Sequence, residues 1–226
     1  MSEPSARARH MKEVIPGVWR WFVLDDRINA ESDAHAVVAA SGTTLIDPLP
    51  LAEKALRRLE PIVAICLTAQ CHQRSAWRYR QQFGVKVYAP AGVRPMEENA
   101  DVWYRAGDLL PGGLQAIHTP GPEEVHYGFW LTRAPGVFFC PDLLMHGKGK
   151  IEFVPPEFHT DPAATQASVR RLLDLRFSVL CFNHGAPITD NPQAALREFL
   201  QVLSGLAPTG SRCDSNITRC SRLCCR

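Results

Sequence analysis

Residues 62–75, with the sequence IVAICLTAQCHQRS, pass from a continuous apolar segment into a polar loop. The apolar segment, residues 62–67, has the pattern of a strand that is covered on both of its faces. The loop that follows carries Cys71, His72 and Arg74. This stretch therefore predicts an α/β protein with a site at the end of a buried strand.

Three more loops follow apolar strands in the same way. They are residues 119–126, 141–146 and 183–187, and each contains a histidine or an aspartate. Strand ends that converge on one edge are the usual place for a binding or catalytic site. We therefore expect a site where these four loops meet.

The order of the elements predicts two mixed sheets. Apolar periodicity and turn signals indicate hairpins, then helix–strand alternation, a second hairpin region and a final helix–strand–helix segment. Helices outside these sheets would bury the strands on both sides, so we expect the fold class α/β (α+β), built as a four-layer αββα sandwich. The expected strands are residues 14–24, 35–40, 43–46, 62–67, 85–89, 114–118, 127–132, 137–140 and 177–182, and the expected helices are residues 51–59, 72–83, 161–175 and 191–205.

Charge and composition restrict the partners. The chain of 226 residues has 25 basic and 23 acidic residues, but residues 212–226 alone hold four arginines and one aspartate. The rest of the chain is close to neutral, so we expect no nucleic-acid partner. No apolar run approaches the roughly 18 residues of a membrane span, so we expect no membrane partner either. We expect a disordered lead over residues 1–12, a single domain over residues 13–206 and a disordered Cys/Arg-rich tail over residues 207–226.

The cysteines indicate a compartment. Cys66, Cys71, Cys140 and Cys181 are dispersed through apolar segments, as is typical of thiols in a reducing compartment. The four cysteines of the tail form no C-x-x-C pair, which disfavours a zinc site there. The N-terminal residues lack the apolar segment of a secretory signal. We therefore expect a cytoplasmic protein.

Six short motifs carry a family resemblance. In chain order they are residues 15–19 (IPGVW), 44–48 (TLIDP), 65–68 (ICLT), 118–121 (HTPG), 138–142 (FFCPD) and 183–187 (NHGAP). In this order and spacing, over roughly residues 14–190, they resemble the metallo-β-lactamase fold superfamily, which includes glyoxalase II-like thioester hydrolases. The resemblance implies the same αββα fold. Any single motif of the six is weak.

The resemblance also assigns metal-ligand positions, most of which have lost their ligand. Active members bind two metal ions through an H-x-H-x-D-H run, a histidine after TPG, a bridging aspartate and a final histidine. In this chain only Asp142 and His184 keep the expected ligand type. The resemblance implies that these two residues, although far apart along the chain, face one another across a shared cleft. The other positions hold Ala69, Cys71, Gln73, Arg74 and Pro122. Alanine and proline donate nothing to a metal and Arg74 adds a fixed positive charge, so we expect no dinuclear centre.

A rearranged site for a single ion is the remaining metal hypothesis. Asp142 and His184 would hold the ion with help from Cys71 or His72, and the ion would be zinc, or else iron or manganese. The alternative is that His72 begins a helix and faces solvent, and that Cys71 is a small buried apolar residue.

Three residues are expected to support the metal ligands, namely Asp47, Arg74 and His118. The alternative for His118 is that it lies along its strand and makes a hydrogen bond to the backbone. Without a metal, Arg74 would pair with Asp142 and replace the missing cation. His126 is expected to be a loop or strand-edge histidine, and His146 a surface-loop residue.

Two functions follow as hypotheses. The first is a hydrolase in which Asp142 and His184 are catalytic and a water activated by one metal attacks an ester or thioester. The second is a catalytically inactive member of the fold that serves as a binding or scaffolding protein. A mononuclear-iron oxygenase of the same fold ranks last. The substrate or ligand is an unknown small molecule, selected by the variable segments 94–105 and 145–159.

Overall fold

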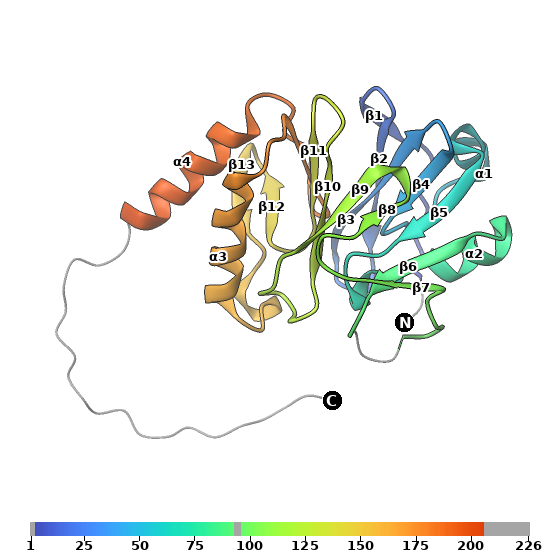
Figure 1. The fold of residues 1–226 in the computed structure, drawn as a ribbon, viewed down its shortest axis with the longest axis horizontal. Helices are drawn as coiled ribbons and strands as arrows, with labels where there is room; N and C mark the ends of the chain where they lie inside the picture. Colours follow the sequence, from blue (N-terminus) through green and yellow to red (C-terminus); the bar gives the residue numbers. More distant parts are fainter. Residues whose placement is uncertain (1–2, 93–95, 206–226) are drawn as a thin grey trace, which may run out of the picture.

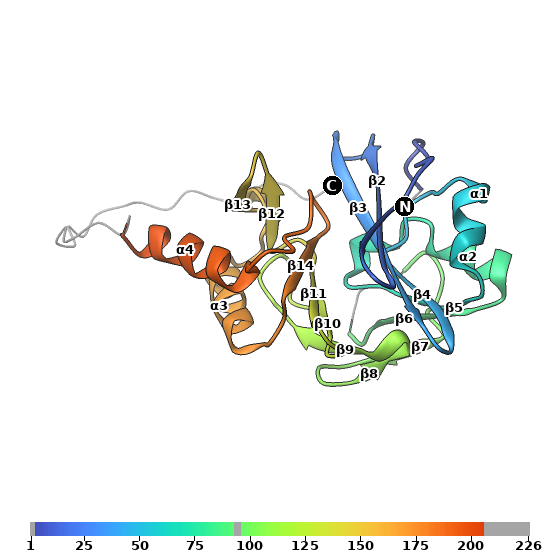
Figure 2. The same cartoon turned by 90° about the horizontal axis from the view of Figure 1, so that it is seen from above.

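The computed structural model describes residues 3–92 and 96–205, which form two facing sheets with helices on the outer faces. Helices α1 (Glu53–Leu56) and α2 (Ala76–Phe83) cover the first sheet. Helices α3 (Pro162–Arg171) and α4 (Pro192–Gly205) cover the second sheet (Figure 1). Figure 2 shows the layers in succession from α4 and α3 across both sheets to α2 and α1. The predicted four-layer αββα sandwich is confirmed.

The first sheet has seven strands, which are hydrogen-bonded in the order of the chain. They are β1 (Lys12–Ile15), β2 (Val18–Asp25), β3 (Ala30–Ala39), β4 (Gly42–Ile46), β5 (Ile62–Cys66), β6 (Lys86–Pro90) and β7 (Val102–Tyr104). Strands β1 to β4 pair antiparallel, and β4 to β7 pair parallel. The carboxyl ends of β4 and β5 therefore lie at the same edge of this sheet.

The second sheet has five strands in the order β14-β11-β10-β9-β8. They are β8 (Leu109–Leu110), β9 (Leu114–His118), β10 (Tyr127–Leu131), β11 (Val137–Cys140) and β14 (Val179–Phe182). Strands β11 and β14 are parallel, so their carboxyl ends also coincide. A separate hairpin of β12 (Leu144–Gly147) and β13 (Lys150–Phe153) completes the strands.

Three apolar cores fill the spaces between the four layers. Along β11, Val137 and Phe139 pack between the sheets, whereas Phe138 and Cys140 pack against α3 and α4. The same alternation divides β4 and β5 between the inter-sheet core and the core beneath α1 and α2. Because both faces of these strands are buried, their sequences read as continuous apolar runs.

The helices begin close to the predicted positions, with one clear exception. Asp161 caps α3, since its Oδ1 accepts a hydrogen bond from the Ala164 N–H at 2.9 Å, and Pro162 takes the first helical position. The predicted helix over residues 72–83 instead starts at Ala76. Arg74 has a φ of +39°, which no right-handed helix can contain, so the preceding residues form a separate turn.

The lead and the surface segments are more ordered than expected. Residues 3–12 pack on the domain, where the Ala8 N–H donates to Pro50 O at 2.9 Å and Arg78 pairs with Glu3 at 2.8 Å. Residues 96–113 contain β7 and β8, and residues 145–159 contain most of the β12–β13 hairpin. The predicted tail over residues 207–226 lies outside the described residues. Within the described ranges, none of the helices has the length and apolar character needed to cross a membrane.

His35 is a buried polar side chain of the inter-sheet core without a hydrogen-bond partner among the described residues. His35 of β3 is fully buried, and neither ring nitrogen makes a hydrogen bond to the described residues. Its ring packs edge-on against Phe139, with 5.3 Å between the centroids. Burial, reinforced by the positive charge of Arg20, lowers the pKa of His35 from 6.5 to about 3. The folded protein therefore keeps this imidazole neutral, whereas the unfolded chain protonates it near pH 6.5.

We expect His35→Leu to remove part of the acid sensitivity of the fold. Below pH 6.5 the unfolded state binds a proton at His35 that the folded state does not bind. The free energy of unfolding is therefore highest, as far as His35 is concerned, above pH 6.5, and it falls as the pH drops toward 3. Between pH 7.5 and pH 5 this one group should cost the wild type about 2 kcal/mol of unfolding free energy. Asp33, whose pKa burial raises to about 6, acts in the opposite direction in both proteins, so the difference between them isolates His35. Urea unfolding at both pH values measures it.

The exposed His10 provides the control. His10→Asn should lose as much stability on acidification as the wild type does. If His35→Leu lost as much stability on acidification as the wild type, His35 would not be a source of the acid sensitivity.

Candidate functional site

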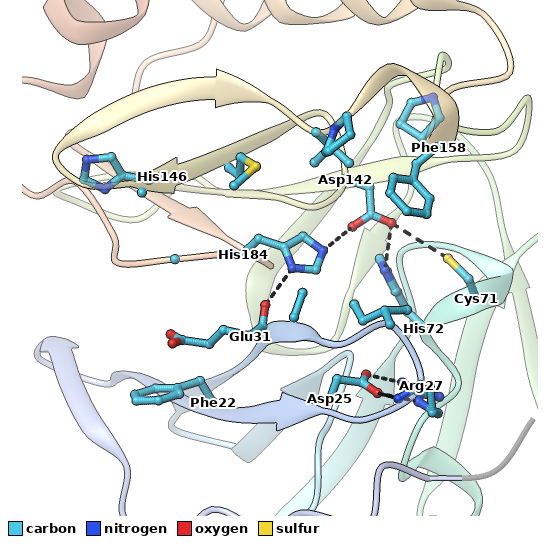
Figure 3. A pocket seen from close by; sticks show the side chains of 18 of the residues that line it. Phe22, Asp25, Arg27, Glu31, Cys71, His72, Asp142, His146, Phe158 and His184 are labelled. Atoms are coloured by element: carbon cyan, nitrogen blue, oxygen red, sulfur yellow. Dashed lines mark hydrogen bonds and ion pairs between the residues drawn. The ribbon is translucent and has the colours of Figure 1, made fainter.

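A cleft of about 1080 Å³ opens where the strand ends of the two sheets meet. Cys71 and His72 enter it from the turn after β5, Asp142 from the end of β11, and His184 from the end of β14 (Figure 3). The predicted meeting of Asp142 and His184 is therefore present in the structure. The two side chains face each other, with 3.3 Å between Asp142 Oδ1 and His184 Nε2.

Asp142 also approaches the loop after β5. Its Oδ2 lies 3.0 Å from His72 Nε2 and 3.9 Å from Cys71 Sγ. One ligand atom from each of Cys71, His72 and Asp142 falls within 4.8 Å of the other two. His72 is 3% exposed, so it does not face solvent as the alternative reading of the sequence required.

The hydrogen bonds of His72 determine which ring nitrogen carries a proton. Thr68 Oγ1 donates to Asp47 Oδ2 at 2.5 Å and lies 2.8 Å from His72 Nδ1. Because the threonine proton is already used, Nδ1 must donate to this oxygen, with Asp47 Oδ2 3.2 Å away. His72 therefore presents Nε2 to Asp142.

His184 is oriented by the backbone of β3 in the same way. Its Nδ1 lies 2.8 Å from Glu31 O, a carbonyl that can only accept, so Nδ1 carries a proton. Its Nε2 then faces Asp142 Oδ1, an oxygen that is buried and accepts no hydrogen bond from the described residues. Two imidazoles thus direct their Nε2 atoms at the two oxygens of one carboxylate.

The charges of these groups are strongly coupled. Burial alone would raise the pKa of Asp142, but His72 and His184 outweigh it and hold that pKa well below 3.8. Burial alone would lower the pKa of His72, yet Asp142, Cys71 and Asp47 raise it well above 6.5. Burial raises the pKa of the Cys71 thiol above 9.0, against the opposing effect of His72. The cluster therefore needs positive charge, in the form of protons or a cation.

Asp47 lies behind the cluster, at the position expected for it. It is fully buried at the end of β4, where its Oδ1 accepts from the Thr68 N–H at 2.8 Å. Asn183 Nδ2 donates to its Oδ2 at 3.0 Å. Asp47 thereby connects the loop after β5 to the loop after β14, which carry His72 and His184.

Arg74 does not have the partner expected of it. Its Nη1 donates to the backbone oxygens of Asp33 at 2.8 Å and Asp47 at 3.3 Å. The ion pairs among the described residues include none between Arg74 and Asp142, because His72 and His184 take that role. The positive φ of Arg74 turns the chain here, and the guanidinium binds the carbonyl of Asp33, within β3, and that of Asp47, just after β4.

His118 does not support the site either. Its Nε2 lies 2.8 Å from Glu124 O, and its ring packs on Tyr127, with 5.1 Å between the centroids. It is absent from the residues that line the cleft. The expectation that it supports the ligands is therefore wrong, since Glu124 O and Tyr127 hold its ring outside the cleft.

His126 is the site residue that the sequence analysis missed. It is fully buried and lines the cleft, and its Nδ1 lies 2.7 Å from Thr119 O, so Nδ1 carries the proton. Its Nε2 has no partner among the described residues. Burial lowers the pKa of His126 to about 4, so the ring is neutral at pH 7 and offers Nε2 as a hydrogen-bond acceptor. The sequence signal for this role was the position of His126 directly before β10, at the end of the loop that contains Pro122.

The donor set fits one metal ion. Zinc bonds of about 2.0–2.3 Å place the donor atoms of a tetrahedral site roughly 3.3–3.8 Å apart. Asp142 Oδ2 lies 3.0 Å from His72 Nε2 and 3.9 Å from Cys71 Sγ, close to that range, and these three residues form the group of mutually close donor atoms. His184 Nε2 approaches the other oxygen, Oδ1, at 3.3 Å and would complete the site from that side. A ligating histidine commonly gives its other ring N–H to a carboxylate or carbonyl, as His184 does to Glu31 O, and the Nδ1–H of His72 donates to Thr68 Oγ1 with the carboxylate of Asp47 3.2 Å away. A thiolate with imidazoles and a carboxylate suits zinc better than magnesium or manganese.

Comparison with known proteins places the chain in a family. The DIM-1 metallo-beta-lactamase superposes with a TM-score of 0.71 at 13% identity, over 89% of this chain and 99% of that chain. A metallo-beta-lactamase from Pontibacter korlensis gives 0.66 at 17% identity, over 86% and 98% of the two chains. An archaeal metallo-beta-lactamase superfamily protein from Sulfolobus tokodaii gives 0.63 at 15% identity, over 82% and 85%. A search of curated proteins finds no match.

These similarities to solved structures show the fold alone, and a glyoxalase II-like subclass stays a prediction. A family model described as the metallo-beta-lactamase superfamily matches residues 11–203, which is most of the chain. The chain belongs to the metallo-beta-lactamase superfamily.

Proposed function

We propose that this protein is a hydrolase that uses one zinc ion to cleave an ester or thioester of a small molecule. The observation that supports it is the convergence of Cys71, His72 and His184 on the carboxylate of Asp142, with both imidazoles presenting Nε2. Ala69, Gln73 and Pro122 remove the donors of a second ion, so a single ion is the limit.

Cys71, His72, Asp142 and His184 would hold the ion, and their neighbours fix the orientation of the two imidazole rings. A bound zinc ion supplies a Lewis acid and lowers the pKa of a coordinated water to about 7. Asp47 and Thr68 hold the ring of His72, and Glu31 O holds the ring of His184, so neither imidazole can turn its Nε2 away.

His126 has a separate role in this proposal. Its neutral ring accepts a hydrogen bond at Nε2 from a water molecule or from a substrate hydroxyl or amide in the cleft. This hydrogen bond would satisfy Nε2, a buried acceptor that otherwise costs about 1–3 kcal/mol of free energy because it has no partner.

Hydrolysis by stripped and reloaded protein tests the proposal. Tag-free protein is treated with a chelator, dialysed and assayed with p-nitrophenyl acetate, p-nitrophenyl butyrate and a simple acyl thioester, with and without one equivalent of zinc. We expect hydrolysis only after zinc is restored. His118→Asn, which changes a histidine outside the cleft, should behave like the wild type. Folded, zinc-loaded protein that cleaves none of these carbonyl compounds would refute the proposed activity.

A metal-free binding protein is the second candidate, and one observation favours it. His72 lies between the carboxylates of Asp47 and Asp142, so its protonated ring can neutralise them without any metal. In that case the protein would stay folded, bind no zinc and show no hydrolysis in the same assay.

A further inference from the structure

We infer that the cleft takes an uncharged substrate whose acyl group is apolar, bound between two apolar walls above the donor cluster. This inference rests on the proposed function, because it names the substrate class of the same site.

The first observation is where exposed apolar side chains gather. Phe22, Ile28 and Phe158 are 49%, 48% and 60% exposed, and all three line this cleft. Large side chains exposed together in a concave site mark a surface that binds an apolar partner. If an apolar ligand covered these side chains, the free energy of binding would become more favourable in proportion to the apolar area removed from water.

The second observation is that these side chains form two facing walls. Phe22 and Ile28 come from β2 and the turn after it, whereas Phe158 comes from the turn that follows β13. Met145 of β12 and Val154 extend the second wall. In Figure 3, Phe22 and Phe158 lie on opposite sides of the pair formed by Asp142 and His184. A group held between the walls is therefore next to the donors.

The third observation concerns charge. Three arginines line the cleft, and each is already engaged by the protein. Arg20 pairs with Asp33 and Glu31, Arg27 pairs with Asp25 at 2.5 Å, and Arg74 donates to two backbone oxygens. These contacts hold the guanidinium groups, so an anionic substrate would have to compete with protein groups for them, and the cation left open to it would be the proposed zinc ion. An apolar acyl chain needs no cation, and the cleft volume of about 1080 Å³ accommodates such a chain.

A chain-length series tests the inference kinetically. Zinc-loaded protein is assayed with the p-nitrophenyl esters of acetate, butyrate, hexanoate and octanoate. We expect kcat/KM to rise by roughly fourfold for each methylene that the walls bury. Phe158→Ser should lower the ratio of kcat/KM for octanoate over acetate about tenfold, because one wall is lost. Leu109→Ser, at an exposed leucine of β8 outside the cleft, should leave the ratio unchanged.

A binding measurement separates this inference from the proposed function. The neutral fluorescent probe N-phenyl-1-naphthylamine is titrated into metal-free wild type, Phe158→Ser and Leu109→Ser. We expect saturable binding that weakens about tenfold in Phe158→Ser alone. Probe binding with this pattern and no ester hydrolysis would overturn the hydrolase but keep the apolar site. Hydrolysis without chain-length preference, together with equal probe binding in all three proteins, would overturn the apolar site but keep the hydrolase.

Discussion

Asp142→Ala should lose zinc and lower kcat/KM for ester hydrolysis by about 1000-fold or more. The carboxylate of Asp142 approaches Cys71, His72 and His184 together. Without its charge, the two imidazoles lose the anion that draws positive charge to the cluster. Zinc content after dialysis and steady-state kinetics measure the two effects. Asp142→Asn keeps the shape of the side chain but removes its negative charge. We therefore expect this variant to lose zinc almost as completely as Asp142→Ala.

A matched control separates this effect from a general loss of charge. Asp174 is an exposed aspartate outside the cleft, and Asp174→Ala should keep both zinc and activity. If Asp142→Ala retained one zinc per chain and full activity, Asp142 would not be a ligand.

Gly185→Ala should destabilise the fold by about 4 kcal/mol or more. A Cβ at this position would lie 1.9 Å from the backbone oxygen of His146, and the φ of +110° strains any L side chain. The Gly185 N–H also donates to Asp33 Oδ2 at 2.8 Å, so the loop cannot move aside without breaking this bond. The substitution should displace the neighbouring His184 from Asp142 as well. Urea unfolding measures the loss of stability.

Gly149 gives the matched comparison. It has a φ of +74° in the turn between β12 and β13, but a Cβ there would meet nothing within 4 Å. Gly149→Ala should therefore cost only the backbone strain, about 1 kcal/mol. A Gly185→Ala protein as stable as Gly149→Ala would show that the close approach to His146 is not rigid.

The strand ends explain why much of the fold was predictable. Segment 62–67 is continuously apolar, and segment 177–182 is apolar apart from Ser178, because β5 and β14 are buried on both faces. Asp142 and His184 directly follow parallel strands, so their meeting depends only on strand register. Register is set by regular hydrogen bonding, which the apolar pattern reports.

The residues within irregular turns were not predictable in the same way. Arg74 has a positive φ, and this reversal directs its guanidinium to two carbonyls instead of to Asp142. His72 lies in a short turn before α2, so helical spacing gave the wrong direction for its ring. The direction of His126 depends on a hydrogen bond across its own loop to Thr119. In each case a local backbone geometry without a periodic pattern decides the contact.

Anomalous diffraction at the zinc edge, from crystals soaked in zinc chloride, tests the central claim most directly. That claim is that Cys71, His72, Asp142 and His184 together hold one ion. We predict a single zinc peak bounded by these four side chains, which disappears in crystals of Asp142→Ala. A map with no peak in the cleft, at a zinc concentration that saturates binding elsewhere on the protein, would contradict it.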